Sequence, residues 1–182
     1  MSGRTLRYYW DSCVILAHLK NEVQKHPEVP IIKRLLEANA AWENSILGSQ
    51  IVKTEVLNFE LNEEAISSFN AFYSQGQNNI ADVDGRVAAL AGEIRHYYRV
   101  HPIIKGNSRR GVQTPDAIHL ATAIVYKVDE FHTLDIGILD LGDRVADKYD
   151  LNICKPNFPI TPRESKVDDG QRELFDEDDR LS

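Results

Sequence analysis

Apolar and polar positions along the first half of the chain form blocks that predict strands followed by helices. The segment LRYYWDSCVIL has the pattern of an apolar strand that ends near Asp11 and passes into a helix through about Lys20. After a loop with two prolines, helical spacing returns over residues 31–42, and ILGSQIV then resembles a short buried strand. Thr54 is placed to cap the following helix, which would put Glu55 in the first turn.

The second half of the chain repeats this alternation. Residues 63–73 and 85–100 predict two amphipathic helices, and the glycine-rich segment KGNSRRGVQ predicts a loop. Thr114 followed by a proline is a strong start signal for a helix that carries Asp116, because proline is tolerated at the first helical position. EFHTLD then predicts a short strand that ends at Asp135.

Strands that alternate with helices indicate an α/β fold, with a mainly parallel central sheet between two helical layers in a three-layer α/β/α arrangement. Ligands of such folds bind beyond the carboxyl ends of the strands. Four acids stand where predicted strands end or helices begin, so we expect them to share one pocket: Asp11, Glu55, Asp116 and Asp135. Neighbouring carboxylates raise one another's pKa, and a hard divalent metal would neutralise them.

Length and composition are those of an ordinary globular protein, with 42% apolar and 27% charged residues in 182. We expect one domain over residues 1–160, followed by a flexible acidic tail over residues 161–182.

No apolar run approaches the roughly 20 residues of a membrane helix, and the opening segment lacks the pattern of a secretion signal. Cys13 and Cys154 have neither metal-site spacing nor the density of a disulfide scaffold, so we expect a cytoplasmic protein without membrane association.

The net charge of −7 argues against a nucleic-acid partner, but its distribution along the chain changes that expectation. Residues 163–182 contain eight acids and four bases, so this segment alone contributes −4. The stretch from Arg95 to Pro115 contains five basic residues, two histidines and no acid. A local positive field is therefore expected around this stretch, whose basic residues are Arg95, Arg99, Lys105, Arg109 and Arg110.

These motifs together resemble the PIN-domain ribonuclease family. YYWDSCVILAHL is similar to the opening strand and helix with the first aspartate, and KTEVLNFEL to the helix with the glutamate. TPDAIHLATAIVYK is similar to the helix with the third acid and its DA-x-x-x-A-T-A pattern, and FHTLD to the final threonine and aspartate. The resemblance spans Leu6 to about Cys154, and the single-domain length is most like the toxin nucleases of bacterial toxin–antitoxin pairs.

The resemblance implies hydrolysis of RNA phosphodiester bonds at a site of four carboxylates, with products that carry a 5′-phosphate and a 3′-hydroxyl. Oxygen ligands suit Mg²⁺, for which Mn²⁺ could substitute. It implies metal binding by Asp11, Glu55, Asp116 and Asp135, with Asp11 and Asp116 as direct ligands, and a Thr133 hydroxyl that fixes a ligand or a water. It also implies a homodimer and an inhibitory antitoxin protein that fills the acidic groove.

Other residues near the predicted pocket have ordinary explanations as well as functional ones. Arg109 and Arg110 could hold substrate phosphates through their forked donors, and an ordinary solvated loop explains them equally well. His119, one turn after Asp116, is expected to be buried with a satisfied ring nitrogen rather than to act as a base. The aromatic run YYW is expected in the core rather than against RNA bases.

Several other families share single features of this pattern. A haloacid dehalogenase phosphatase needs a second aspartate two residues after the first, where Cys13 stands. A receiver domain needs an acidic pair and a later lysine that the chain does not place, and no GxxxxGK[ST] or GxGxxG occurs. A catalytically weak module that binds RNA or protein on the same scaffold stays open, although the presence of all four acids favours an enzyme.

Overall fold

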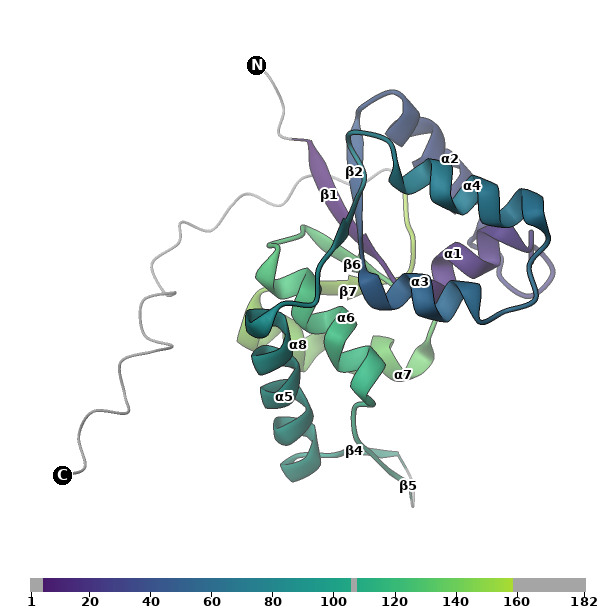
Figure 1. Cartoon of the computed structure of the whole chain (residues 1–182). Coiled ribbons are helices and arrows are strands. Elements are labelled where there is room, and N and C mark those ends of the chain that lie inside the picture. The colour runs from purple at the N-terminus through teal and green to yellow at the C-terminus, as the bar shows by residue number, and fades with distance from the viewer. Residues whose placement is uncertain (1–4, 106–107, 159–182) are drawn as a thin grey trace.

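The computed structural model describes residues 5–105 and 108–158, and a parallel sheet lies at its centre (Figure 1). The strand order in this sheet is β3-β2-β1-β6-β7, so β1 is the middle strand and every neighbouring pair is parallel. The five strands are β1 (Leu6–Trp10), β2 (Asn44–Ser49), β3 (Asn79–Ala81), β6 (Glu130–His132) and β7 (Asn152–Cys154).

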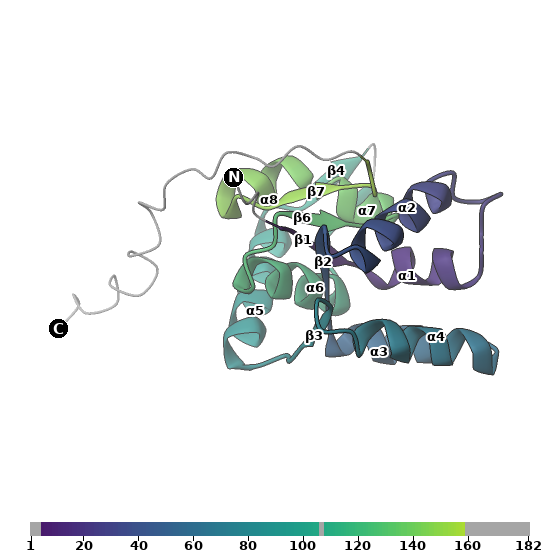
Figure 2. The same cartoon turned by 90° about the horizontal axis from the view of Figure 1, so that it is seen from above.

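Helices cover both faces of this sheet. Figure 2 shows α1 to α4 grouped together, with α5 and α6 side by side next to this group, where α6 contacts α3. The helices in the described residues are α1 (Ser12–Leu19), α2 (Val29–Ala40), α3 (Gln50–Leu57), α4 (Glu63–Tyr73), α5 (Gly85–Val100), α6 (Thr114–Val125), α7 (Ile136–Leu139) and α8 (Gly142–Tyr149).

The middle strand divides the hydrophobic core into two clusters. Because successive side chains of a strand point to opposite faces, Tyr9 packs with α5, α6 and α8, whereas Tyr8 and Trp10 pack with α1 to α4. All three aromatic residues are buried, which agrees with the core position expected for them. The structure therefore confirms the three-layer α/β/α fold with a parallel central sheet. The predicted tail over residues 161–182 lies outside the described residues.

Two predicted boundaries before the pocket residues are wrong. The strand β2 ends at Ser49 and α3 begins at Gln50, so Thr54 lies inside this helix instead of capping it. Val52 and Val56 point into the core one helical turn apart, and a short apolar run with this spacing does not distinguish a strand from a helix. As a result, Glu55 lies in the second turn of α3 rather than the first.

Similar corrections apply to the second half of the chain. The cap of α6 is Gln113, and Thr114 is the first residue of the helix. The strand β6 ends at His132, and Asp135 follows it as the cap of α7. The predicted loop KGNSRRGVQ begins inside an antiparallel pair, because β-branched residues before it favour a strand. This pair consists of β4 (Ile103–Lys105) and β5 (Ser108–Arg110).

The pairing of β1 with β6 continues past the last residue of each strand. The Asp11 N–H donates to the His132 carbonyl at 3.1 Å, and the Thr133 N–H donates to the Cys154 carbonyl at 3.1 Å. The carboxyl ends of the three strands β1, β6 and β7 are therefore held in register where the pocket was predicted. No helix in the described ranges is long and apolar enough to cross a membrane.

Candidate functional site

Asp11 is the most constrained of the predicted pocket residues. It follows β1, is 4% exposed, and caps α1 by accepting a hydrogen bond from the Ser12 N–H at 2.7 Å. Its second carboxylate oxygen accepts from the Thr133 hydroxyl at 2.7 Å and from the Cys13 thiol at 3.1 Å. The capping position and these side-chain donors hold the Asp11 carboxylate in one orientation at the carboxyl end of β1.

Thr133 joins the segment after β6 to this aspartate. It is fully buried, donates to Asp11, and accepts a hydrogen bond from the Asp135 N–H at 3.0 Å. The exposed Asp135 carboxylate in turn accepts from the Gly137 N–H and so begins α7. Thr133 therefore orients the Asp11 carboxylate directly.

A buried histidine connects Glu55, in α3, with Asp11. His119 is 1% exposed, and its Nε2 lies 2.8 Å from a Glu55 oxygen and 3.6 Å from an Asp11 oxygen. Its Nδ1 lies 2.6 Å from the Tyr9 hydroxyl, which donates its own proton to Ser49 at 2.9 Å. Since the Tyr9 oxygen is then free to accept, the arrangement suits an imidazolium that donates from both nitrogens.

The charges around His119 agree with that protonation state. Burial disfavours the charged ring, but the hydrogen bond to Glu55 and the charges of Asp11, Glu55 and Asp116 raise its pKa above the ordinary value. Burial likewise disfavours the Glu55 carboxylate, while the hydrogen bond and charge of His119 and a hydrogen bond from Ser12 lower its pKa overall. The expectation of a buried, satisfied His119 is confirmed, although its partners place it inside the pocket.

Asp116 lies in the first turn of α6 and is half-buried. Burial raises its pKa, and the negative charges of Asp11 and Asp135 raise it further. His119 and the backbone N–H of Gln113 offset only part of this effect. The structure thus brings all four predicted acids within electrostatic reach of one another or of His119, and we call this group the acid pocket: Asp11, Glu55, Asp116 and Asp135.

The acid pocket fits a hard divalent cation. Its four carboxylates outnumber the one imidazole that can carry a positive charge, and burial together with the charges of Asp11 and Asp135 raises the pKa of Asp116. Both ring nitrogens of His119 are engaged by Tyr9 and Glu55, so the available donors are carboxylate oxygens. Oxygen-only ligand sets are those that Mg²⁺ and Mn²⁺ prefer.

One of the two predicted phosphate-binding arginines lies beside this pocket. The Arg110 guanidinium rests on Gly137 so closely that a Cβ there would lie 2.5 Å from its central carbon. Gly137 is in the first turn of α7, which Asp135 caps. The missing side chain at Gly137 thus lets the exposed Arg110 approach the rim of the acid pocket. The side chain of Arg109 lies outside the described residues.

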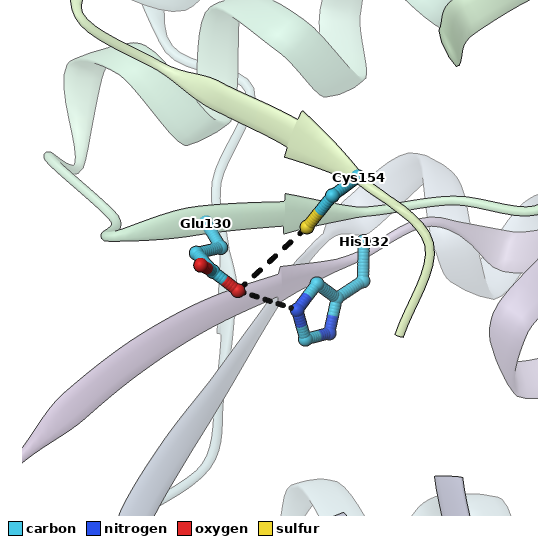
Figure 3. Close-up of side chains that lie close together, drawn as sticks. All are labelled: Glu130, His132 and Cys154. Atoms are coloured by element: carbon cyan, nitrogen blue, oxygen red, sulfur yellow. Dashed lines mark hydrogen bonds and ion pairs between the residues drawn. The ribbon is translucent and has the colours of Figure 1, made fainter. Parts of the chain in front are cut away.

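A second group of metal-capable side chains lies on the face of β6 and β7 that Tyr8 and Trp10 share (Figure 3). We call Glu130, His132 and Cys154 the strand trio. His132 Nε2 lies 3.1 Å from a Glu130 oxygen, and the Cys154 sulfur lies 3.7 Å from the same oxygen. Sequence reasoning missed this group, but the parallel register that pairs His132 with Cys154 could have revealed it.

The hydrogen bonds of the strand trio leave little room for a cation. The indole N–H of Trp10 donates to His132 Nδ1 at 3.2 Å, and because an indole only donates, Nδ1 must accept. The proton of the neutral ring is therefore on Nε2, where it points at Glu130. Burial lowers the pKa of His132, and burial together with Glu130 raises the pKa of Cys154 to about 12. We interpret the trio as a hydrogen-bond network that joins β1, β6 and β7.

Comparisons with known proteins agree with this fold. One protein-family model, described as the PIN domain, matches residues 8–144. The crystal structure of VapBC2 from Rickettsia felis bound to a promoter DNA fragment is 18% identical, with a TM-score of 0.56 over 84% of this chain and 100% of that chain. The crystal structure of Mycobacterium tuberculosis VapC20, a Sarcin-Ricin loop cleaving toxin, is 16% identical, with a TM-score of 0.52 over 74% of this chain and 95% of that chain. Comparison with curated proteins gave no match.

Proposed function

Because the chain belongs to the PIN domain family, we propose that it is a metal-dependent ribonuclease that hydrolyses RNA phosphodiester bonds at the acid pocket. The observation that carries this proposal is the convergence of four carboxylates from separate elements, where burial raises the pKa of Asp116 and the charges of Asp11 and Asp135 raise it further. Such repulsion is costly unless a cation relieves it. We assign Mg²⁺ to the site, with Mn²⁺ as a substitute.

Each residue of the pocket then has a distinct part. A bound divalent cation supplies acidification of a water and neutralisation of charge on the phosphate. Asp11 and Asp116 are the direct ligands, Asp11 being held by Thr133 and Asp116 by the first turn of α6. Glu55 and Asp135 complete the acid set, and the hydrogen bond from His119 fixes the direction of Glu55. The products carry a 5′-phosphate and a 3′-hydroxyl.

We further propose that the protein is the toxin of a toxin–antitoxin pair. The structures similar to it include VapC20, a Sarcin-Ricin loop cleaving toxin, and VapBC2 on a fragment of promoter DNA. The partners that follow are an RNA substrate, a second copy of the chain, and an antitoxin protein that covers the acidic groove. The support for these partners is the resemblance in fold, together with the size of the domain.

The test is cleavage of end-labelled RNA by the purified chain in the presence of Mg²⁺. We expect cleavage that chelation with EDTA abolishes, that Mn²⁺ restores, and that Asp116→Asn reduces by at least about 100-fold, because a direct metal ligand is lost. Asp147→Asn removes an exposed carboxylate of α8 and is the matched control. Cleavage that survives both EDTA and Asp116→Asn would refute the metal mechanism, and RNA binding without any cleavage would indicate a binding module instead.

A further inference from the structure

A cleft of about 650 Å³ separates α5 from the segment that leads into α6. The α5 side is formed mainly by Arg95, His96 and Arg99, and the opposite side by Gly111, Val112 and Gln113. No acidic residue lines it, although the chain as a whole carries a charge of −7. We call this feature the α5 cleft, and its lining is the part of the predicted basic stretch that the structure gathers in one place.

The arginines of the α5 cleft are available to an anionic ligand. Arg95 and Arg99 are exposed and lie one helical turn apart, about 6 Å along the axis, so both line the same side of the cleft. Arg99 lies 3.0 Å from His96 Nδ1, a neutral partner. Within the described residues, neither arginine forms an ion pair with a carboxylate, so their charges are not neutralised by the fold.

Gln113, at the start of α6, links the α5 cleft to the acid pocket along the chain. It lines the cleft and caps this helix three residues before Asp116, and its backbone N–H offsets part of the raised pKa of that carboxyl. The cleft therefore ends one helical turn from a proposed metal ligand. The N-terminal end of α6 adds a partial positive charge at the same place, which favours an anion between cleft and pocket.

We propose that the α5 cleft binds the phosphate backbone of the RNA strand whose scissile bond lies in the acid pocket. This inference rests on the proposed function, since it extends the path of the substrate away from the reacting phosphate. Guanidinium groups match phosphate oxygens with forked donors, and contacts of this kind position a strand without reading its sequence. Arg95 and Arg99 thus set the direction in which RNA enters, and neither takes part in bond cleavage.

The experiment measures RNA binding in the Asp116→Asn background, so that cleavage does not interfere. The probe is a fluorescein-labelled single-stranded RNA, followed by anisotropy over a series of salt concentrations. We expect Arg95→Gln with Arg99→Gln to weaken binding by about tenfold or more at low salt, because two phosphate contacts are lost. The slope of log affinity against log salt should fall in magnitude by about 1.4, or roughly 0.7 for each contact with a single strand.

The matched control is Arg86→Gln, which removes a positive charge from the first turn of the same helix. Arg86 pairs with Asp84 and is not part of the cleft lining. We expect this variant to bind RNA within about twofold of its parent, in keeping with an exposed charge away from the contact. Equal affinity of the control and of the Arg95/Arg99 double variant would overturn the proposal.

A second measurement separates an RNA site from a protein site. If the double variant binds RNA as its parent does but loses binding of an acidic peptide that matches residues 163–182, the cleft recognises a protein segment and the RNA proposal is wrong. The proposed catalysis is tested independently. If RNA binding depends on both arginines but the native chain shows no metal-dependent cleavage, the cleft proposal stands and the nuclease proposal is wrong. If cleavage depends on the metal but RNA binding does not depend on the arginines, only the nuclease proposal stands.

Discussion

The acid pocket and the strand trio each contain a buried histidine whose Nε2 faces a glutamate, yet the pKa values of the two histidines are shifted in opposite directions. His119 lies 2.8 Å from Glu55 and has a raised pKa, whereas His132 lies 3.1 Å from Glu130 and has a lowered one. The number of nearby acids accounts for part of this difference, since Asp11 and Asp116 also act on His119.

The other part lies on β1, at the far nitrogen of each ring. Tyr9 faces His119 with a hydroxyl that can accept a proton, and Trp10 faces His132 with an indole that can only donate. A histidine–carboxylate pair therefore does not by itself mark a metal site. In the acid pocket, carboxylates outnumber the positive charge. In the strand trio, one carboxylate is satisfied by its neighbours.

The largest difference between the two groups should appear in catalysis. We expect Asp11→Asn to reduce RNA cleavage by at least about 100-fold, because it removes a metal ligand while asparagine keeps the capping hydrogen bond of α1. The same change in the strand trio, Glu130→Gln, should leave cleavage within about threefold, since its expected effect is on stability. Initial rates of both variants at equal folded concentration check this. Equal losses would show that the trio takes part in the reaction.

A smaller difference should appear in how stability depends on pH. The raised pKa of His119 means that its stabilising contribution is fully present below its ordinary value of 6.5 and is lost as pH rises through the folded-state pKa. The lowered pKa of His132 has the opposite consequence, because the unfolded state gains a proton below pH 6.5 that the folded state resists. Stability attributable to His132 therefore falls as pH decreases from 6.5.

Urea unfolding of the metal-free protein between pH 5 and 8 measures both effects. Relative to the native chain, the free energies of unfolding of His119→Gln and His132→Gln should change with pH in opposite directions, by on the order of 1 kcal/mol across the range. His96→Gln, an exposed substitution, serves as the control for replacing a histidine by glutamine. Slopes of the same sign for the two buried positions would contradict the protonation states assigned to them.

The smallest effect concerns the indole that fixes the tautomer of His132. Trp10→Phe removes the donor to Nδ1 while keeping an aromatic ring in the core, so the neutral ring loses a stabilising partner and the pKa of His132 should rise. Titration of the His132 ring signals by NMR measures the shift, with the exposed Trp42→Phe as control. An unchanged pKa in the Trp10 variant would mean that burial and Glu130 alone determine the protonation of His132.

The fold was largely predictable because its signals are local. An apolar strand followed by a capping aspartate identified the junction at Asp11, and amphipathic spacing placed the helices at residues 63–73 and 85–100 where the structure has them. The start of α3 was misplaced because the short run of apolar and polar residues after β2 fits the periodicity of a strand as well as that of a helix. The hairpin of β4 and β5 was missed because its glycine and arginines dominate the composition of the segment.

Convergence in space was harder to predict than the elements themselves. The acids of the pocket were expected to meet because parallel strands share a carboxyl edge, but nothing local indicated that His119 would contact Glu55 across 64 residues. The strand trio depends on the neighbours of β6 in the sheet, which strand content alone does not determine. Such pairings follow from strand order and register, and these depend on packing of the whole domain.

Tyr9 and Trp10 are adjacent on β1, so the surroundings of both buried histidines depend on the register of this strand. A shift of β1 by one residue would exchange the faces to which Tyr9 and Trp10 point. A slip that brings Trp10 to the place of Tyr9 also brings Asp11 to the place of Trp10. His119 would then face an indole donor and His132 a carboxylate, so the proton preferences of the two rings would be reversed. Mispairing of a single strand during folding would therefore produce a chain with its ionisation pattern reversed as well as its core disrupted.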